Sequence, residues 1–202
     1  MVSMNRSLLL LLCTALAACK PLGEAEVSDV SQRLVGLEYA AVPLSDSAAE
    51  GLPCKFVSSG DISQAGVKQT GWISGQLLCN DHVPFIFLAK QIGETKFAMA
   101  DGNPPRPYPR NKIVAVQKLP KVSNFSKDGD GLELPELVDS WSGQCDFDGR
   151  GGTSFVALVR WNGESVVKGA PGIEAVWGFD LEAHRVVKLD SKRVACEPML
   201  ME

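Results

Sequence analysis

The chain lacks the residue patterns that are typical of nucleic-acid binding and of zinc sites. Its 202 residues include 20 basic and 24 acidic side chains, which give a formal net charge of -4 at pH 7. A basic patch or an Arg- and Lys-rich helix is missing, so the sequence argues against nucleic-acid binding. The two histidines, His82 and His184, are far apart in sequence and no Cys-x-x-Cys pair occurs, so we expect no zinc site.

The motif of a serine hydrolase is also missing. Nucleophilic hydrolysis needs a serine or cysteine with a general base beside it, and no Gly-x-Ser-x-Gly elbow is present. In residues 71–75 the serine, Ser74, stands one place too late for that motif. We therefore expect a protein that is not an enzyme. Glycoside cleavage by two carboxylates needs no such motif, which leaves an enzyme as a third and less favoured class.

Residues 1–18 have the order of a secretory signal peptide. Arg6 supplies a positive charge, an apolar stretch follows, and small residues precede Cys19. The run Leu16-Ala17-Ala18-Cys19 resembles the lipobox of bacterial lipoproteins. That resemblance implies cleavage before Cys19, lipidation of the Cys19 thiol and acylation of its amino group. Lys20, where an aspartate would mean retention in the inner membrane, implies the outer membrane, on its periplasmic face. A plain signal peptide cleaved after an Ala-x-Ala-like triplet is the alternative.

The mature chain contains an apparent internal duplication. At an offset of 69 residues Trp72 falls on Trp141, and after a one-residue slip Ser74-Gly75-Gln76 falls on Ser142-Gly143-Gln144. From Phe85 onward the offset is 70 and holds without a gap through Leu119. A repeat of this length indicates two related structural units. Chance alignment of small and apolar residues is the alternative.

Four cysteines remain after the signal peptide and Cys19, namely Cys54, Cys79, Cys145 and Cys196. An even number in an oxidising periplasm predicts two disulfides. The repeat favours Cys54–Cys79 and Cys145–Cys196, because each bond then closes a loop within one half. Pairing the equivalent cysteines across the halves is the main alternative.

The apolar runs predict a mainly β fold. Residues 85–89 and 155–159 are short runs of β-branched and aromatic residues, each followed by a Gly-Glu pair that we read as a hairpin turn. Further strands are expected at 71–79, 113–119, 173–179, 185–189 and 193–196. We predict an antiparallel β-sandwich or barrel-like domain built from the duplication.

The predicted organisation has four parts. Residues 1–18 are the signal peptide, 19–50 are the lipidated N-terminus and tether, 51–121 are the first β repeat and 122–202 are the second. A short helix is expected within the tether, where Val27, Val30, Leu34 and Leu37 recur at helical spacing. This helix either docks on the domain or belongs to the tether.

Two acidic, glycine-rich turns are candidate calcium ligands. Asp128 and Asp130 lie in a segment resembling the first half of an EF-hand loop, although Ser126 replaces the first carboxylate and Leu137 stands where a bidentate acid is required. Asp146 and Asp148 form the second turn. Asp-Gly is also a common hairpin turn, which is the alternative to a calcium site. Calcium is the only cofactor that the sequence suggests.

A proline-rich segment at residues 104–110 is the candidate contact surface for a protein partner. Its four prolines predict an extended loop without a continuous hydrogen-bond ladder. It carries Arg106, Tyr108 and Arg110, and arginine and tyrosine are enriched at binding hot spots. A stiff connection that covers a sheet edge is the alternative.

Two functional classes fit these features. The first is a periplasmic, lipid-anchored, protein-binding lipoprotein that acts as an inhibitor or immunity protein against an envelope-degrading enzyme or toxin. The resemblance to small disulfide-bonded inhibitor lipoproteins is one of class only. The second is an accessory or structural lipoprotein of an envelope assembly or secretion complex.

Overall fold

The computed structural model describes residues 30–40, 54–62, 70–80, 83–97, 105–122, 134–140, 144–149, 154–161 and 163–198. Residues 30–34 are helical and Ser191–Arg193 form a 3-10 turn. The strands are β1 (Glu38–Ala40), β2 (Cys54–Asp61), β3 (Trp72–Cys79), β4 (Val83–Phe97), β5 (Arg106–Lys118), β6 (Glu136–Asp139), β7 (Cys145–Phe147), β8 (Phe155–Val159), β9 (Val167–Lys168), β10 (Ile173–Asp180), β11 (Arg185–Leu189) and β12 (Val194–Cys196).

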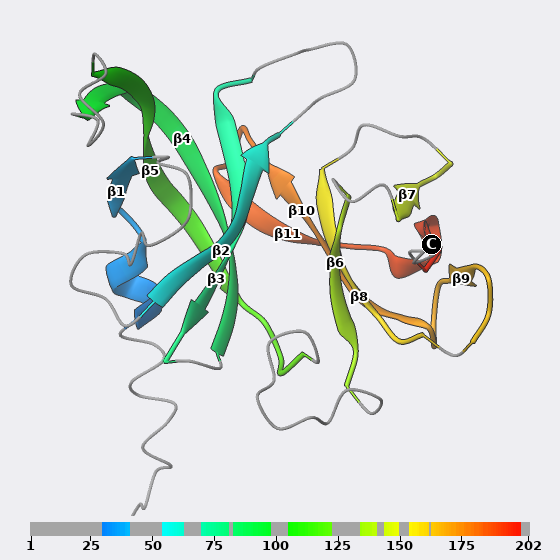
Figure 1. Cartoon of the computed structure of the whole chain (residues 1–202). Coiled ribbons are helices and arrows are strands. Elements are labelled where there is room, and N and C mark those ends of the chain that lie inside the picture. The colour runs from blue at the N-terminus through cyan, green and yellow to red at the C-terminus, as the bar shows by residue number, and fades with distance from the viewer. Residues whose placement is uncertain are drawn as a thin grey trace, which may run out of the picture.

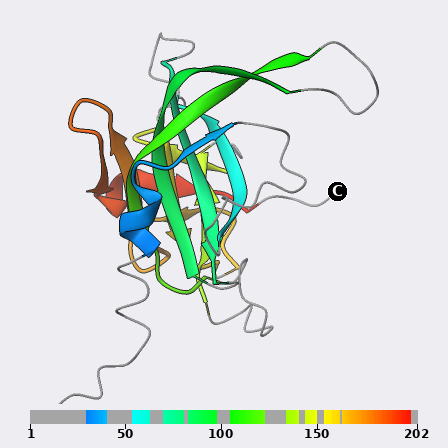
Figure 2. The same cartoon turned by 90° about the vertical axis from the view of Figure 1, so that its left-hand side faces the viewer.

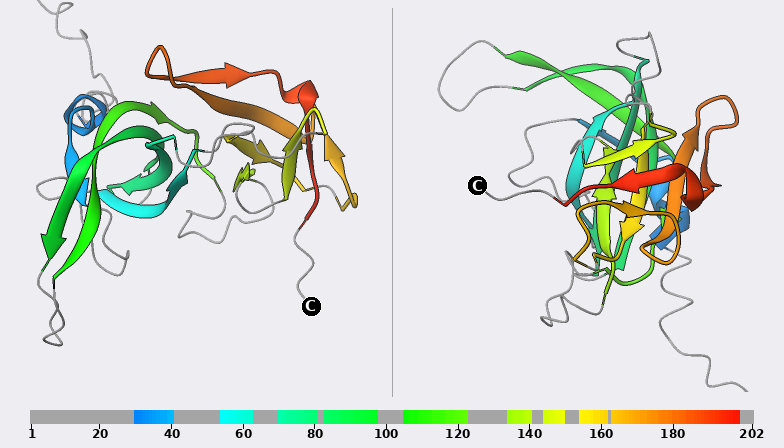
Figure 3. Two further views of the ribbon diagram at one scale, coloured as in Figure 1. Left: turned by 90° about the horizontal axis from the view of Figure 1, so that it is seen from above. Right: turned by 90° about the vertical axis from the view of Figure 1, so that its right-hand side faces the viewer.

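The strands form three antiparallel sheets, so the predicted mainly β fold with one short N-terminal helix is confirmed (Figure 1). The first sheet has the order β1-β5-β4-β3-β2, the second β11-β10-β8-β6 and the third β7-β12-β9. We call residues 30–122 the first half and residues 134–198 the second half. Seen from above, the first sheet curls on one side of the molecule and the other two sheets lie beside it (Figure 3).

Three apolar clusters hold the fold together, one in each half and one between them. Alternate side chains of β4, such as Phe85 and Phe87, pack inside the first half, while Ile86 between them faces the second half. On β8, Phe155 packs inside the second half and Leu158 faces the first. Both strands are therefore buried on both faces, which explains why their sequences are continuous apolar runs instead of alternating ones.

The N-terminal helix docks on the first half. Val30 and Leu34 are buried in its cluster, and Leu37 packs against the same cluster. Gly36 has a φ of 93°, a left-handed conformation that ends the helix at low steric cost. Its N–H donates to the Ile113 carbonyl at 2.8 Å, so the end of the helix is held against β5. Of the two sequence-based options, docking applies to this part of the chain. Within the described ranges, no helix is long and apolar enough to cross a membrane.

Both disulfides join directly opposite residues of neighbouring strands. Cys54 on β2 is bonded to Cys79 on β3, and Cys145 on β7 is bonded to Cys196 on β12. This is the pairing that the sequence favoured. Each bond lies within one half and contributes to the cluster of that half.

The two predicted Gly-Glu hairpin turns are wrong. β4 continues straight through Gly93 and Glu94, and its register with β5 shifts by one residue between Gln91 and Gly93. The glycine therefore serves a β-bulge, where an extra residue is inserted into one strand. In the second half the chain bends at Gly163, but β9 then pairs with β12 in the third sheet and not with β8.

Strand pairing does not show the duplication. β4 and β8 occupy similar central places, and the inner half of β5 pairs with β4. The segment that the sequence aligns with this part of β5 is β11, which pairs with β10, while β10 takes the place beside β8. Duplication therefore stays a prediction.

Candidate protein-binding surface

The distal parts of β4 and β5 form a two-stranded arm that extends past the other described strands (Figure 2). We define the arm as residues 91–97 of β4 and 106–111 of β5. β3 pairs with β4 only as far as Trp72 opposite Lys90, whereas β5 stays paired as far as Arg106 opposite Phe97. A hydrogen-bonded ladder therefore carries backbone away from the body of the protein.

The predicted loss of the ladder at the prolines is wrong for Pro107 and Pro109. They stand opposite Lys96 and Glu94 in a continuous β5 strand. The two prolines are two residues apart, so both nitrogens point to the same edge of β5. The ladder to β4 survives because that edge is the one facing away from β4. The alternation of prolines, and not their number, was the informative signal.

The three predicted contact residues lie on the arm. Arg110 is half-exposed and forms an ion pair of 3.4 Å with Glu38 of β1, which pairs with β5 at this point. Tyr108 is half-buried and lies two residues before Arg110, so the two residues share one face of β5. Arg106 begins β5. The arm also presents Glu94 and Lys96, both exposed, which sequence reasoning missed.

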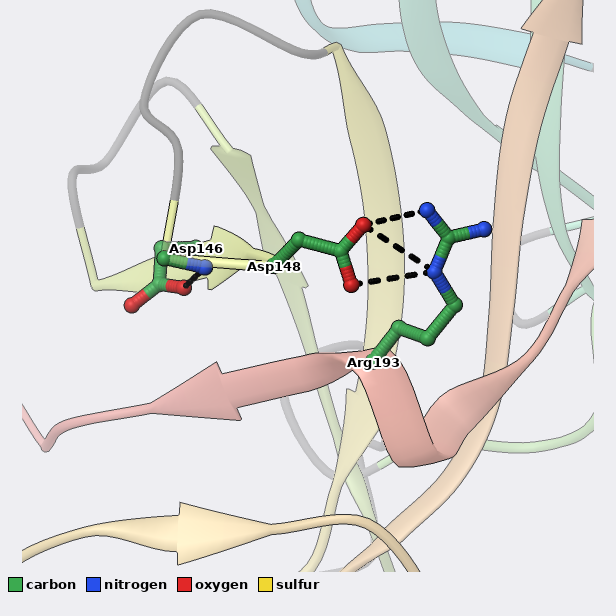
Figure 4. Close-up of polar contacts among 4 residues, drawn as sticks. Asp146, Asp148 and Arg193 are labelled. Carbon is green, nitrogen blue, oxygen red and sulfur yellow. Dashed lines mark hydrogen bonds and ion pairs between the residues drawn. The ribbon is translucent and has the colours of Figure 1, made fainter.

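The predicted acidic turn is occupied by internal contacts (Figure 4). Asp146 accepts a hydrogen bond of 2.7 Å from the N–H of Gly149. The Nε of Arg193 donates to both carboxylate oxygens of Asp148, at 3.0 Å to Oδ1 and 3.1 Å to Oδ2. The Nη2 of Arg193 also donates to Oδ2. This carboxylate raises the pKa of Arg193 above its already high ordinary value. The guanidinium also lies over the Phe147 ring, 4.3 Å from its centroid.

Calcium binding at Asp146 and Asp148 would require this ion pair to break. Asp128 and Asp130, the other two predicted ligands, lie outside the described residues. Among the described residues, no group of three or more His, Cys, Asp or Glu side chains is placed to hold a metal ion. Asp148 thus ties the acidic turn to the 3-10 turn at Ser191–Arg193, and calcium binding there stays a prediction.

A polar contact joins the two halves. Gln76 of β3 donates a long hydrogen bond of 3.5 Å to Asp139 of β6. The hydroxyl oxygens of Ser58, Ser74 and Ser154 are buried and have no hydrogen-bond partner within the described part of the chain. Ser74 is 0% exposed, which suits a packed position and not a nucleophile that must reach a substrate. The aligned Ser142 lies outside the described residues.

The glycine of the Ser-Gly-Gln motif has a packing role. A Cβ added at Gly75 would lie 2.5 Å from Cζ of Phe87 and 2.5 Å from the carbonyl oxygen of Ser58. Both distances are well inside van der Waals contact. Glycine is therefore required where the Phe87 ring crosses β3 beside the irregular segment of β2.

The tryptophan before this motif joins the halves at the surface. The Trp72 ring lies 4.9 Å from the ring of His184, which is in the turn between β10 and β11. The ammonium of Lys90, on the neighbouring strand β4, lies 5.5 Å from the centroid of the Trp72 ring. His184 thus contacts an aromatic ring of the other half, and His82 lies outside the described residues.

The core of the first half contains one strongly shifted titratable group. Tyr39 lies within 4.6 Å of Phe56 and 6.0 Å of Phe87, measured between ring centroids. Burial raises the pKa of the Tyr39 hydroxyl well above its ordinary value, and the neighbouring Asn111 side chain offsets part of that rise. The hydroxyl makes no hydrogen bond of normal geometry within the described residues.

No protein-family model, curated protein or solved structure matches the chain.

Proposed function

We propose that this chain is a lipid-anchored periplasmic protein that binds and inhibits an envelope-degrading enzyme or toxin through the arm. The observation that carries the proposal is the arm itself, a hydrogen-bonded β ribbon that extends beyond the sheets and holds Tyr108 and Arg110 on one face. A ribbon fixed before binding loses less conformational entropy on association than a flexible loop. Such a shape is suited to insertion into the active-site groove of an enzyme.

The chemistry of the arm supports a protein partner. Tyrosine and arginine supply large contact areas and several hydrogen-bond donors at interface hot spots. Glu38 holds the Arg110 guanidinium through a partly exposed ion pair, which leaves part of the guanidinium accessible. A carboxylate or backbone carbonyl of the partner fits this donor set.

The compartment is supported by the sequence and the disulfides together. Cys19 in its Leu-Ala-Ala-Cys context supplies the expected anchor. Two disulfides join strands of the domain, and disulfides persist in oxidising compartments such as the periplasm. In this proposal the domain is held at the outer membrane by the segment before the docked helix.

A pull-down from envelope extract tests the proposal. The bait is the mature chain from Lys20 onward, compared with Tyr108→Ala/Arg110→Ala and with Lys188→Ala, a control at an exposed position of β11. Removing two hot-spot side chains should weaken binding by about 30-fold or more. The control should bind as the original chain does.

The captured protein is then assayed on purified cell-wall material with and without the domain. A hydrolase that is captured through the arm and inhibited supports the proposal. Capture of assembly or secretion components instead would favour the accessory role. Turnover of the cell-wall substrate by the domain itself, with no hydrolase captured, would refute the proposal.

A further inference from the structure

The two edges of the arm differ in their ability to accept another strand. On the β5 edge, β1 already pairs with residues 110–112, and farther out Pro107 and Pro109 have no N–H to donate. On the β4 edge, none of residues 92–97 is proline and no described strand pairs beyond the contact of Gln91 with Gly71. Strand addition to the arm is therefore directed to β4.

The prolines also determine which β4 groups face that edge. A proline cannot take part in a hydrogen-bonded antiparallel pair, since such a pair needs both N–H groups. Pro109 opposite Glu94 and Pro107 opposite Lys96 are therefore non-hydrogen-bonded pairs. It follows that the N–H and C=O groups of Glu94 and Lys96 point away from β5, toward the open edge.

We propose that the β4 edge binds the same edge of a second copy of this chain. In antiparallel pairing about a two-fold axis through Thr95, Glu94 of each copy stands opposite Lys96 of the other. Their outward backbone groups form two hydrogen-bonded pairs, which amounts to four backbone hydrogen bonds. The opposed carboxylate and ammonium groups form two cross-strand ion pairs, and the first sheets of the two copies become continuous.

Charge selects this register over its neighbours. Sliding the second strand by two residues places Glu94 opposite Glu94 in one direction and Lys96 opposite Lys96 in the other, and like charges directly opposite each other destabilise a sheet. Ile92, 38% exposed at the bulge, marks where the regular edge begins.

The contact is short, so dimerisation should depend strongly on concentration and increase where a lipid anchor confines the chain to a surface. The inference itself does not depend on the proposed function.

Sedimentation velocity of the mature chain from Lys20 onward tests the pairing by charge exchange. The original chain should show a monomer–dimer equilibrium. Glu94→Lys or Lys96→Glu alone should raise the dimer dissociation constant at least about 10-fold, because either change turns both Glu94–Lys96 pairs of the contact into like-charge pairs. An equal mixture of the two variants should restore dimers, because each then meets an opposite charge. Glu182→Lys, at an exposed turn, is the matched control and should behave as the original chain does.

Two further variants test the geometry. Lys96→Pro removes an outward N–H that the β4–β5 ladder does not use, so it should abolish dimers while the circular dichroism spectrum is retained. Thr95→Cys should form an intermolecular disulfide on mild oxidation, since opposed residues of a non-hydrogen-bonded pair have Cα atoms about 4.5 Å apart. A chain that stays monomeric at millimolar concentration, or a variant mixture that does not recover dimers, would overturn the proposal. Tyr108→Ala/Arg110→Ala, which changes side chains of β5 only, should leave the monomer–dimer equilibrium as it is in the original chain, and this separates the contact from the proposed function.

Discussion

Replacing Leu158 by alanine should destabilise the whole domain, because Leu158 belongs to the cluster that joins the halves. It is 1% exposed and packs with Ile86 of β4 and Trp177 of β10. Each half has its own core and disulfide, so this shared cluster is the principal apolar contact that couples them.

The magnitude follows from the atoms removed. Leucine to alanine deletes three carbon groups, and at about 0.8 kcal/mol per buried methylene the lost transfer free energy is about 2.4 kcal/mol. A cavity between two sheets adds to this, because the surroundings relax only in part, and buried Leu→Ala changes cost about 2 to 5 kcal/mol. We expect the free energy of unfolding to fall by about 3 to 4 kcal/mol.

Urea unfolding of the mature chain, followed by tryptophan fluorescence and by circular dichroism, measures this change. Trp177 lies in the same cluster, so it contributes a change in emission when the halves separate, alongside the other three tryptophans. Val57→Ala, at a position that is 40% exposed on β2, is the control and should cost less than about 1 kcal/mol. A loss for Leu158→Ala as small as that of the control would refute the view that this cluster couples the halves.

Three further predictions concern the interior. Gly75→Ala should cost about 1 to 3 kcal/mol in urea unfolding, because its Cβ would meet Phe87 and the Ser58 carbonyl; a neutral effect would contradict the packing role. Tyr39 is held protonated by burial, so unfolding, which frees it to ionise, becomes easier as the pH rises above 10.0. Tyr39→Phe should reduce that alkaline loss of stability in unfolding curves at pH 8 and pH ~11, and an unchanged loss would exclude Tyr39 as its source. Replacing both cysteines by alanine should cost about 4 kcal/mol for Cys145–Cys196 and about 3.5 kcal/mol for Cys54–Cys79, from sequence separations of 51 and 25 residues; a reversed order would show that loop length does not govern the effect.

The strands that the sequence predicted well are those with a strong local signal. Residues 155–159 and 185–189 coincide with β8 and β11, because β-branched and apolar residues mark buried strands. Gly93 misled, because a Gly-Glu pair suits a turn and a bulge equally well, and only the partner strand decides between them. The assignment of β9 to the third sheet depends on β12, which is distant in sequence.

The candidate surface was predictable in part for the same reason. Tyr108 and Arg110 were identified from composition, but their place on a paired strand depends on the register with β4. The ion pair of Asp148 with Arg193 joins residues 45 apart in sequence, so local reasoning could not predict it, and calcium binding at Asp148 stays a prediction. The outward-facing backbone groups of Glu94 and Lys96 can be identified only from the pairing of these residues with Pro109 and Pro107.

Site-specific photo-cross-linking tests the proposed role of the arm most directly. A photoreactive phenylalanine analogue is placed at Tyr108 in the full chain, expressed in its native cells, and the same analogue is placed at Lys188 on β11 as the control. The proposal predicts a cross-linked adduct with an envelope-degrading enzyme or toxin from position 108 and none from position 188. Absence of such an adduct at position 108, or the same adduct from both positions, would contradict the assignment of the arm as the binding surface.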